Sequence, residues 1–177
     1  MSNIRTPPII TPMIRAFCDE IAPGQDPVYL RIRTRACCKP SECYRNAWAV
    51  ATRHGGEVVH GWAITDWPGA YLEAEHHAVV RFKGELVDVT PQPYAKVLFV
   101  PDPTRPCSKS AVRPFPNMFK VLVDDPVVTA YLGVFQRFRE LTNNSQREVR
   151  IDAVAFGALQ RDAVVIVARM EEKYSQH

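Results

Sequence analysis

Strand-like and helix-like spacings of hydrophobic residues alternate in the first two thirds of this 177-residue chain, and the last third has helical spacing alone. Runs of β-branched and aromatic residues between turn formers predict strands. Apolar positions three and four residues apart predict helices. The predicted strands cover residues 28–35, 57–64, 76–82, 86–90 and 97–100, and the predicted helices cover residues 14–21, 42–54, 127–141 and 149–174.

This order of elements predicts an α+β domain, in which the helix at residues 42–54 packs on an antiparallel sheet and the C-terminal helices support it. Residues 1–12 contain three prolines and little periodicity, so we expect a flexible arm before a single domain at residues 13–177. Within that domain, residues 91–117 are a proline-rich loop and residues 127–174 are helical. A capping box at residues 145–148 precedes either one long helix or two helices broken near Gly157.

The helix that follows Pro40 carries a cysteine in its first turn. Ser41 is a good N-cap residue, and Ala47 and Val50 would anchor the helix on a core. The first amides of a helix have no partner within it, and the helix dipole is positive there. Both effects favour a thiolate, so Cys43 is a candidate nucleophile.

A predicted hairpin at residues 76–90 carries candidate partners for this cysteine. Lys83-Gly84 suits a two-residue turn, across which the numbers of paired residues sum to about 167. His77 then lies opposite residue 89 or 90, and Asp88 is within a residue or two of that position. A bulge or a longer turn would change the pairing, so the sequence does not settle it. His76 faces the other side of the strand and is the weaker candidate.

A cysteine, a histidine and an aspartate together supply the parts of a thiol enzyme. His77 would take the proton of Cys43 and return it to a leaving group. Asp88 would hold the ring in the useful tautomer and favour its protonated form. These three are the predicted catalytic residues, and Asn46 and Trp62 are the predicted substrate-binding residues.

These residues resemble the papain-like superfamily of cysteine enzymes, and its transglutaminase-like branch more closely. The resemblance covers roughly residues 36–92 and lies in Cys43-Tyr44-Arg45-Asn46-Ala47, Gly61-Trp62, His77-Ala78-Val79-Val80 and Asp88-Val89-Thr90-Pro91. It implies a papain-like or transglutaminase-like fold with Cys43 as nucleophile, His77 as base and Asp88 as the orienting residue. The implied activity is that of a hydrolase or acyltransferase (a protease, an amidase or a transglutaminase-like enzyme). Such an enzyme acts on an amide or ester bond through a thioester intermediate.

Two positions differ from the pattern of these families. Val79 replaces the tryptophan that usually follows the histidine, and Cys37 stands where papain-type peptidases place a glutamine. The Cys43 amide is then the one oxyanion donor that the sequence identifies.

Other functions stay open beside the enzymatic one. Cys37, Cys38 and Cys43, with His76 or His77, would offer thiolates and an imidazole to zinc, although their spacing differs from that of zinc knuckles. A binding module without catalytic activity would keep the same core. Asn46 would either touch a substrate carbonyl or cap a neighbouring loop. Trp62 would either line a cleft or pack in the core.

Composition fits a globular domain, since the chain is 46% hydrophobic and long enough to bury a sizeable core. It has no stretch of the length and apolar character of a signal peptide or a membrane span, so we expect a cytoplasmic protein. Its five cysteines are irregularly spaced, which favours reduced thiols. We expect neither a cofactor nor a metal.

The formal charge is +3, and part of it comes from arginines that alternate along the first predicted strand. Arg31, Arg33 and Arg35 would suit an acidic partner or a nucleic-acid backbone. We favour a solvated strand face, which is the usual meaning of a charge run, and no nucleic-acid motif is present. The expected partner is a peptide, a protein or a small acyl or amide substrate, with no nucleic acid and no membrane.

Overall fold

The computed structural model describes residues 3–111, 115–143 and 153–174. Its order of helices and strands confirms the predicted α+β class. The elements are α1 (Pro12–Ile21), β1 (Val28–Ile32), α2 (Cys43–His54), β2 (Glu57–Trp67), β3 (Tyr71–Phe82), β4 (Glu85–Asp88), β5 (Lys96–Pro101), β6 (Met118–Val121), α3 (Pro126–Asn143) and α4 (Ala153–Tyr174).

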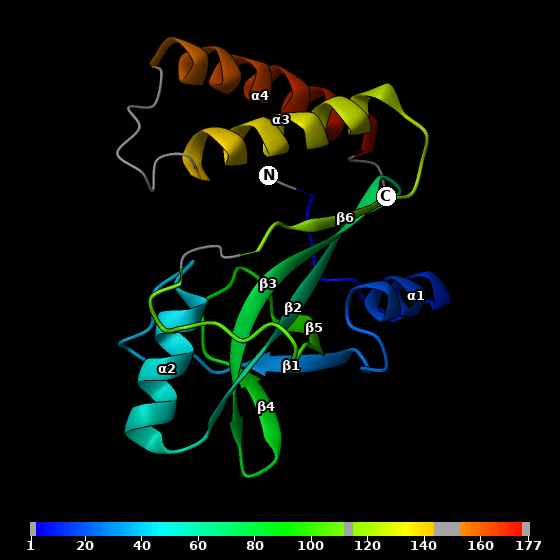
Figure 1. The fold of residues 1–177 in the computed structure, drawn as a ribbon. Helices are drawn as coiled ribbons and strands as arrows, with labels where there is room; N and C mark the ends of the chain where they lie inside the picture. The colour runs from blue at the N-terminus through cyan, green and yellow to red at the C-terminus, as the bar shows by residue number, and fades with distance from the viewer. Residues whose placement is uncertain (1–2, 112–114, 144–152, 175–177) are drawn as a thin grey trace. The chain divides into compact units, whose positions relative to one another are not determined.

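The strands form a sheet that closes into a small barrel. Their order is β2-β5-β1-β4-β3-β6, and a further pairing between β2 and β3 completes the ring (Figure 1). The prediction of an antiparallel sheet is wrong for one pair of strands, because β1 runs parallel to β4. This pairing joins strands that are far apart in the sequence, and it places the end of β4 beside the chain that leads to α2.

The chain divides into two compact units. The barrel unit comprises residues 4–66 and 72–120, including α1 and α2. The helical unit comprises residues 67–71 and those from 121 onward, including α3 and α4, together with the first three residues.

Helix α2 packs on one face of the β3–β4 hairpin. Its residues Ala47 and Val50 are buried against Ala78 and Val80 of β3, in a cluster that also contains Val87 and Val89. Val79 belongs instead to a second cluster with residues of β1, β2 and β5. Side chains of β3 therefore alternate between α2 and the barrel interior, as the pleat of a strand requires.

The register of the β3–β4 hairpin is the predicted one. Val80 pairs with Val87 and Phe82 pairs with Glu85, so the paired numbers sum to 167. Lys83 and Gly84 both have positive φ, at 48° and 87°, which is the conformation of a two-residue type I′ turn.

Several predicted boundaries differ from the observed ones. β1 ends at Ile32 rather than at residue 35, and β2 continues to Trp67 rather than ending at residue 64. α4 is one helix that continues through Gly157. The predicted capping box at residues 145–148 lies outside the described residues.

Residues of the predicted N-terminal arm contact the barrel unit. Arg5 forms a two-way backbone bridge with Asp66 of β2. The hydroxyl of Thr6 donates to the Lys96 carbonyl of β5, and the Tyr29 hydroxyl donates to the Pro7 carbonyl.

In the helical unit, Asp125 joins the start of α3 to the end of α4. One of its oxygens accepts from the Val127 amide at 2.9 Å, which caps α3. The other accepts from the Tyr174 hydroxyl and lies 2.6 Å from the Lys173 ammonium. The described helices include none with the length and apolar character needed to cross a bilayer.

Candidate active site

Cys43 is the first residue of α2, in the first turn as predicted. The predicted N-cap is wrong, since the helix is preceded by Glu42 at the cap position and no side chain caps it. Ser41 instead has a φ of 61°, a conformation that non-glycine residues adopt at a cost. The first helical hydrogen bond is donated by Asn46 to the Glu42 carbonyl. The amides before Asn46, including that of Cys43, therefore have no partner within the helix.

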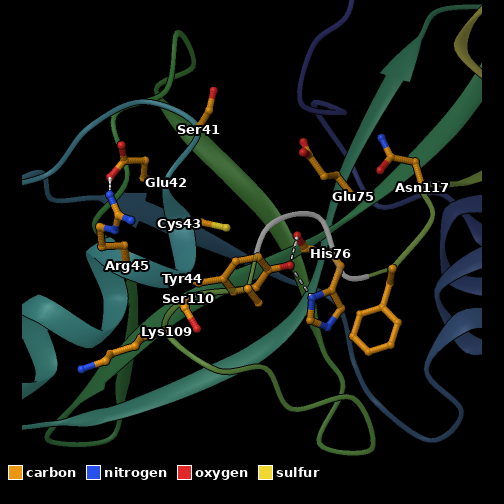
Figure 2. A pocket seen from close by; sticks show the side chains of 12 residues that line it. Ser41, Glu42, Cys43, Tyr44, Arg45, Glu75, His76, Lys109, Ser110 and Asn117 are labelled. Carbon is orange, nitrogen blue, oxygen red and sulfur yellow. Dashed lines mark hydrogen bonds and ion pairs between the residues drawn. The ribbon is translucent and has the colours of Figure 1, made fainter. Parts of the chain in front are cut away.

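Cys43 is half-buried and lines a pocket of about 240 Å³ (Figure 2). Aromatic side chains of Tyr44, His76 and Phe115 form one part of the lining, and charged or polar side chains form the rest. The described lining residues are Ser41, Glu42, Cys43, Tyr44, Arg45, Glu75, His76, Lys109, Ser110, Ala111, Phe115 and Asn117. The pocket thus offers both apolar contact and hydrogen-bonding groups beside the sulfur.

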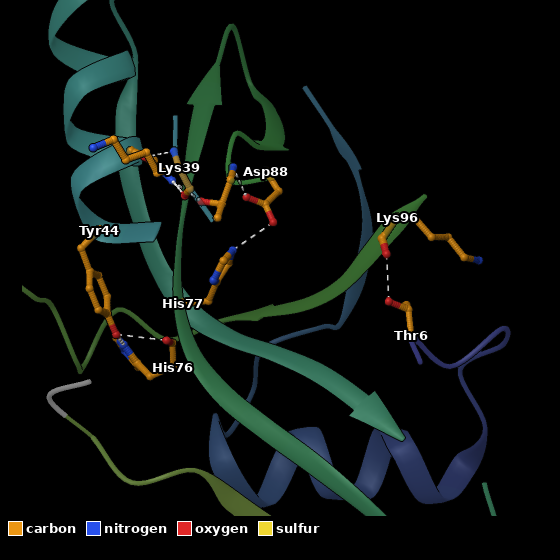
Figure 3. A network of polar contacts seen from close by, with 9 residues as sticks. Thr6, Lys39, Tyr44, His76, His77, Asp88 and Lys96 are labelled. Carbon is orange, nitrogen blue, oxygen red and sulfur yellow. Dashed lines mark hydrogen bonds and ion pairs between the residues drawn. The ribbon is translucent and has the colours of Figure 1, made fainter. Parts of the chain in front are cut away.

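His77 and Asp88 form a buried pair on the opposite side of β3 from His76 (Figure 3). His77 Nε2 lies 3.0 Å from Asp88 Oδ2. In the observed register, His77 would face residue 90, so Asp88 is its diagonal neighbour and lies on the same face of the hairpin. The carboxylate reaches the ring without a bulge.

The second carboxylate oxygen of Asp88 is also used. Asp88 Oδ1 accepts from the Thr90 amide at 2.8 Å, and the main-chain carbonyl of Asp88 accepts from the Arg33 amide. Because the carboxylate is held at both oxygens, it fixes the orientation of the His77 ring. With Nε2 turned to Asp88, Nδ1 is the ring nitrogen left for another partner.

The His77 ring also interacts with Cys43. Burial lowers the pKa of His77, but the charge and hydrogen bond of Asp88 raise it, and so do a hydrogen bond and charge interaction with Cys43. The net result is a pKa well above the ordinary value of 6.5. A protonated ring between a carboxylate and a sulfur is the arrangement that an activated thiol needs.

Asn46 stabilises this arrangement through its hydrogen bonds. It is buried, and its amide nitrogen donates to the Lys39 carbonyl and to Thr90 Oγ1, at 2.7 and 3.2 Å. Its oxygen accepts from the Lys39 amide at 3.0 Å. Asn46 is absent from the described pocket lining, so its geometry matches the loop-capping alternative. It ties the loop before Cys43 to the segment after Asp88.

Trp62 is fully buried, and its indole nitrogen donates to Asp102 Oδ2 at 3.0 Å. It too is absent from the pocket lining that the structure describes. It packs edge-on against His76, with ring centroids 5.0 Å apart, so it supports a residue of the pocket wall from the core.

Sequence reasoning did not propose the aromatic residues of the pocket lining as site residues. These are Tyr44, His76 and Phe115, which form the aromatic wall of the pocket. The Tyr44 hydroxyl donates to the main-chain carbonyl of His76 at 3.0 Å and lies 2.8 Å from its Nδ1. Burial and the nearby His60 lower the pKa of His76 to about 4, so its ring is neutral at neutral pH. The period of two along β3 was a usable signal, because it places His76 on the face of Ala78, which packs under α2.

The cysteines and histidines considered for zinc do not gather into a metal site. Within residues 3–111, 115–143 and 153–174, no group of three or more histidine, cysteine or acidic side chains is arranged to hold a metal ion. Cys37 is exposed, while Cys38, Cys43 and Cys107 are partly buried against the core under α2.

The site was also compared with known proteins. No protein-family model, no curated protein and no solved structure matches this chain. The family suggested by the motifs around Cys43, His77 and Asp88 therefore stays a prediction.

Proposed function

We propose that the chain is a cysteine-dependent hydrolase or acyltransferase that acts on an amide or ester bond, with a papain-like or transglutaminase-like arrangement of its site. The observation that carries the proposal is the buried His77–Asp88 pair, whose ring interacts with a cysteine at an uncapped helix start. Cys43 also lines a pocket, so a bound carbonyl group would meet the sulfur first.

In the proposed resting site the His77 ring already holds the proton of the Cys43 thiol, and in the first half of the reaction the thiolate attacks the carbonyl carbon. The Cys43 amide stabilises the negative charge that develops on the carbonyl oxygen. The bond from carbon to the leaving nitrogen or oxygen then breaks. The leaving group takes the proton from His77, and a thioester remains on Cys43.

In the second half, water or an amine attacks the thioester. His77 takes a proton from the attacking group, and the sulfur leaves as a thiolate when the thioester breaks, which restores the protonated ring beside the thiolate. Asp88 stays ionised throughout and keeps the ring oriented. Water gives hydrolysis and an amine gives acyl transfer, and both use the same residues.

The test combines thiol labelling with turnover of an activated ester. At neutral pH, iodoacetamide should alkylate half-buried Cys43 faster than exposed Cys37, and His77→Ala should slow labelling of Cys43 alone. Mass spectrometry of peptides measures both rates in one sample, so Cys37 is an internal control. Cys43→Ala should abolish ester turnover and leave the circular dichroism spectrum unchanged.

Two results would contradict the proposed function. One is a Cys43→Ala variant that turns over the ester at the normal rate. The other is labelling of Cys43 that is slower than that of Cys37 and indifferent to His77, which is the behaviour expected of a binding module without catalytic activity.

A further inference from the structure

A second pocket lies at the other end of α2. It has a volume of about 230 Å³, and its described lining is Arg33, Arg35, His54, Phe82, Glu85, Val87 and Val89. Since a helix rises about 1.5 Å per residue, the 12 residues of α2 separate this basic pocket from the Cys43 pocket by roughly 17 Å. The two pockets share no lining residue and belong to the same barrel unit.

The basic pocket combines cationic sides with an apolar floor. Phe82 is partly buried and offers an apolar group a surface on which to pack, while Val87 and Val89 also line the pocket but are buried in the core under α2. Arg33 pairs with Glu85 at 3.5 Å, with both side chains more than half exposed, which makes this a weak ion pair. Among the residues that the structure describes, the side chains of Arg35 and His54 have no ion-pair partner. The pocket therefore has an excess of positive charge.

The backbone around this pocket is held in place before any ligand binds. The Arg33 amide donates to the Asp88 carbonyl at 2.7 Å, and the Cys38 amide donates to the Arg35 carbonyl at 2.9 Å. Gly56, after the end of α2, has a φ of 118°. A Cβ there would lie 2.9 Å from both the Arg81 carbonyl oxygen and the Phe82 ring, so glycine allows the chain to pass close to the hairpin. A preformed cationic pocket loses little conformational entropy on binding.

The basic pocket continues into a shallower groove. That groove has a volume of about 500 Å³, shares Arg33 and Glu85 with the pocket, and adds Arg31 and the exposed Val28 of β1. The pocket and the groove, together called the track, thus adjoin at Arg33 and Glu85, and both combine cationic and apolar groups. An extended peptide that carries both acidic and apolar side chains on one face matches this track, whereas a small acid would fill one end of it.

We propose that the track formed by Arg31, Arg33, Arg35 and His54 with Phe82, Val87 and Val89 binds an extended acidic peptide segment of a partner protein. The carboxylates pair with the arginines, and the apolar side chains pack on Phe82 and on the exposed Val28. A nucleic-acid backbone would satisfy the charges but leave the apolar floor unused, so the peptide is the better match. This role lies outside the proposed catalysis and explains the arginines that strand alternation alone left as a solvated face.

The test measures fluorescence anisotropy of a labelled peptide with the repeat Glu-Glu-Leu-Leu, which carries both residue types on each face when extended, added to the full chain. We expect saturable binding that weakens with added salt. Replacing glutamate by glutamine, or leucine by serine, should weaken it. Arg35→Glu should weaken binding by roughly tenfold or more, since one charge-assisted hydrogen bond is lost.

Arg169→Glu is the matched control, because it makes the same change of charge at an exposed residue of α4 and should leave the affinity unchanged. Arg35→Gln provides a milder variant that should also weaken binding. Cys43→Ala should bind the peptide as the wild type does, which separates this proposal from the proposed catalysis. The proposal is overturned if the two Glu variants weaken binding equally. It is also overturned if a labelled oligonucleotide binds as tightly as the peptide, or if the peptide does not bind.

Discussion

The proton on His77 is governed by two opposing influences, burial and the Asp88 carboxylate. Burial disfavours the charged ring, while the carboxylate 3.0 Å from Nε2 favours it and prevails. In the proposed reaction, the protonated ring is the acid that the leaving group needs. The activity should therefore persist well above pH 6.5, the ordinary value for histidine, before it falls as the ring loses its proton.

Replacing Asp88 with asparagine should move that alkaline fall to lower pH, because burial of the ring remains and the carboxylate charge is lost. Turnover should also decrease, but by less than the roughly 10²–10⁴-fold loss expected for His77→Ala. Profiles of kcat/KM against pH for an activated ester, in the wild type and both variants, measure the two effects. An alkaline limb that stays at the same pH in Asp88→Asn would contradict the pairing.

Replacing Asn46 tests whether its hydrogen bonds stabilise the site. Asn46→Ala removes the hydrogen bonds to Lys39 and Thr90, and it leaves the polar groups of those residues without that partner. We expect a loss of about 1–3 kcal/mol in the free energy of unfolding, measured by urea denaturation. Thr52→Ala, at an exposed position of the same helix, is the control and should change it by less than about 0.5 kcal/mol. Equal effects would show that Asn46 has no special role.

At the scale of elements, closure of the barrel depends on a close approach of β2 and β5. Gly61 pairs with Pro101, and a Cβ on it would lie 2.2 Å from the Val100 carbonyl oxygen and 2.8 Å from the Pro101 Cα. Both neighbours are backbone, so neither moves without disturbing the strand pairing.

Gly61→Ala should therefore lower the free energy of unfolding by at least about 2 kcal/mol. Gly133 in α3 is the matched comparison, because a Cβ there meets nothing within 4 Å. Gly133→Ala should raise the stability by about 0.5–1 kcal/mol, as alanine favours the helical backbone. Urea denaturation of the two variants measures both changes. Changes of the same sign would contradict the close approach at Gly61.

Elements set by neighbouring residues could be predicted from the sequence, and those set by distant ones could not. The β3–β4 register followed from Lys83-Gly84 because two-residue turns allow few conformations. The parallel pairing of β1 with β4 joins residues more than 50 positions apart, such as Arg31 and Val87, and no local pattern encodes it. The prediction that Ser41 is the N-cap of α2 was wrong, because Ser41 takes a positive φ and Glu42 occupies the cap position.

Part of the candidate site could be predicted from the sequence, and part of it could not. Sequence reasoning selected Cys43, His77 and Asp88 because their chemistry is distinctive, and it placed the helix and the hairpin that carry them correctly, while their catalytic role stays a prediction. The aromatic wall was missed because Phe115 reaches the pocket from a proline-rich segment whose path no periodicity describes. His76 was set aside because its side chain faces away from His77, yet it lines the pocket together with Cys43.

At the scale of the whole molecule, the two compact units lead to a prediction about Asp125. Hydrogen bonds from Lys173, Tyr174 and the Val127 amide lower the pKa of Asp125 to about 2. Its folded pKa lies below the ordinary value of 3.8, so its contribution to stability is complete above pH 3.8 and is lost as the pH falls through about 2.

Asp125→Ala should loosen α3 and α4, because it removes a helix cap and a tie to the end of the chain. Hydrogen exchange measured by mass spectrometry should accelerate in those helices and stay unchanged in the barrel unit. Asp162→Ala is the control, since the contact of Asp162 with Arg137 is exposed and 3.9 Å long. Equal acceleration in the barrel unit would show that the chain opens as a single cooperative body.

The two-residue turn at Lys83-Gly84 also limits how this protein can change over evolution. Inserting or deleting one residue there would exchange the two faces of β4, so that Val87 or Val89 would point at His77 and Asp88 would point away. Descendants that keep the chemistry are then expected to vary in length elsewhere, for example in the long proline-rich stretch, and to conserve the length of this small loop.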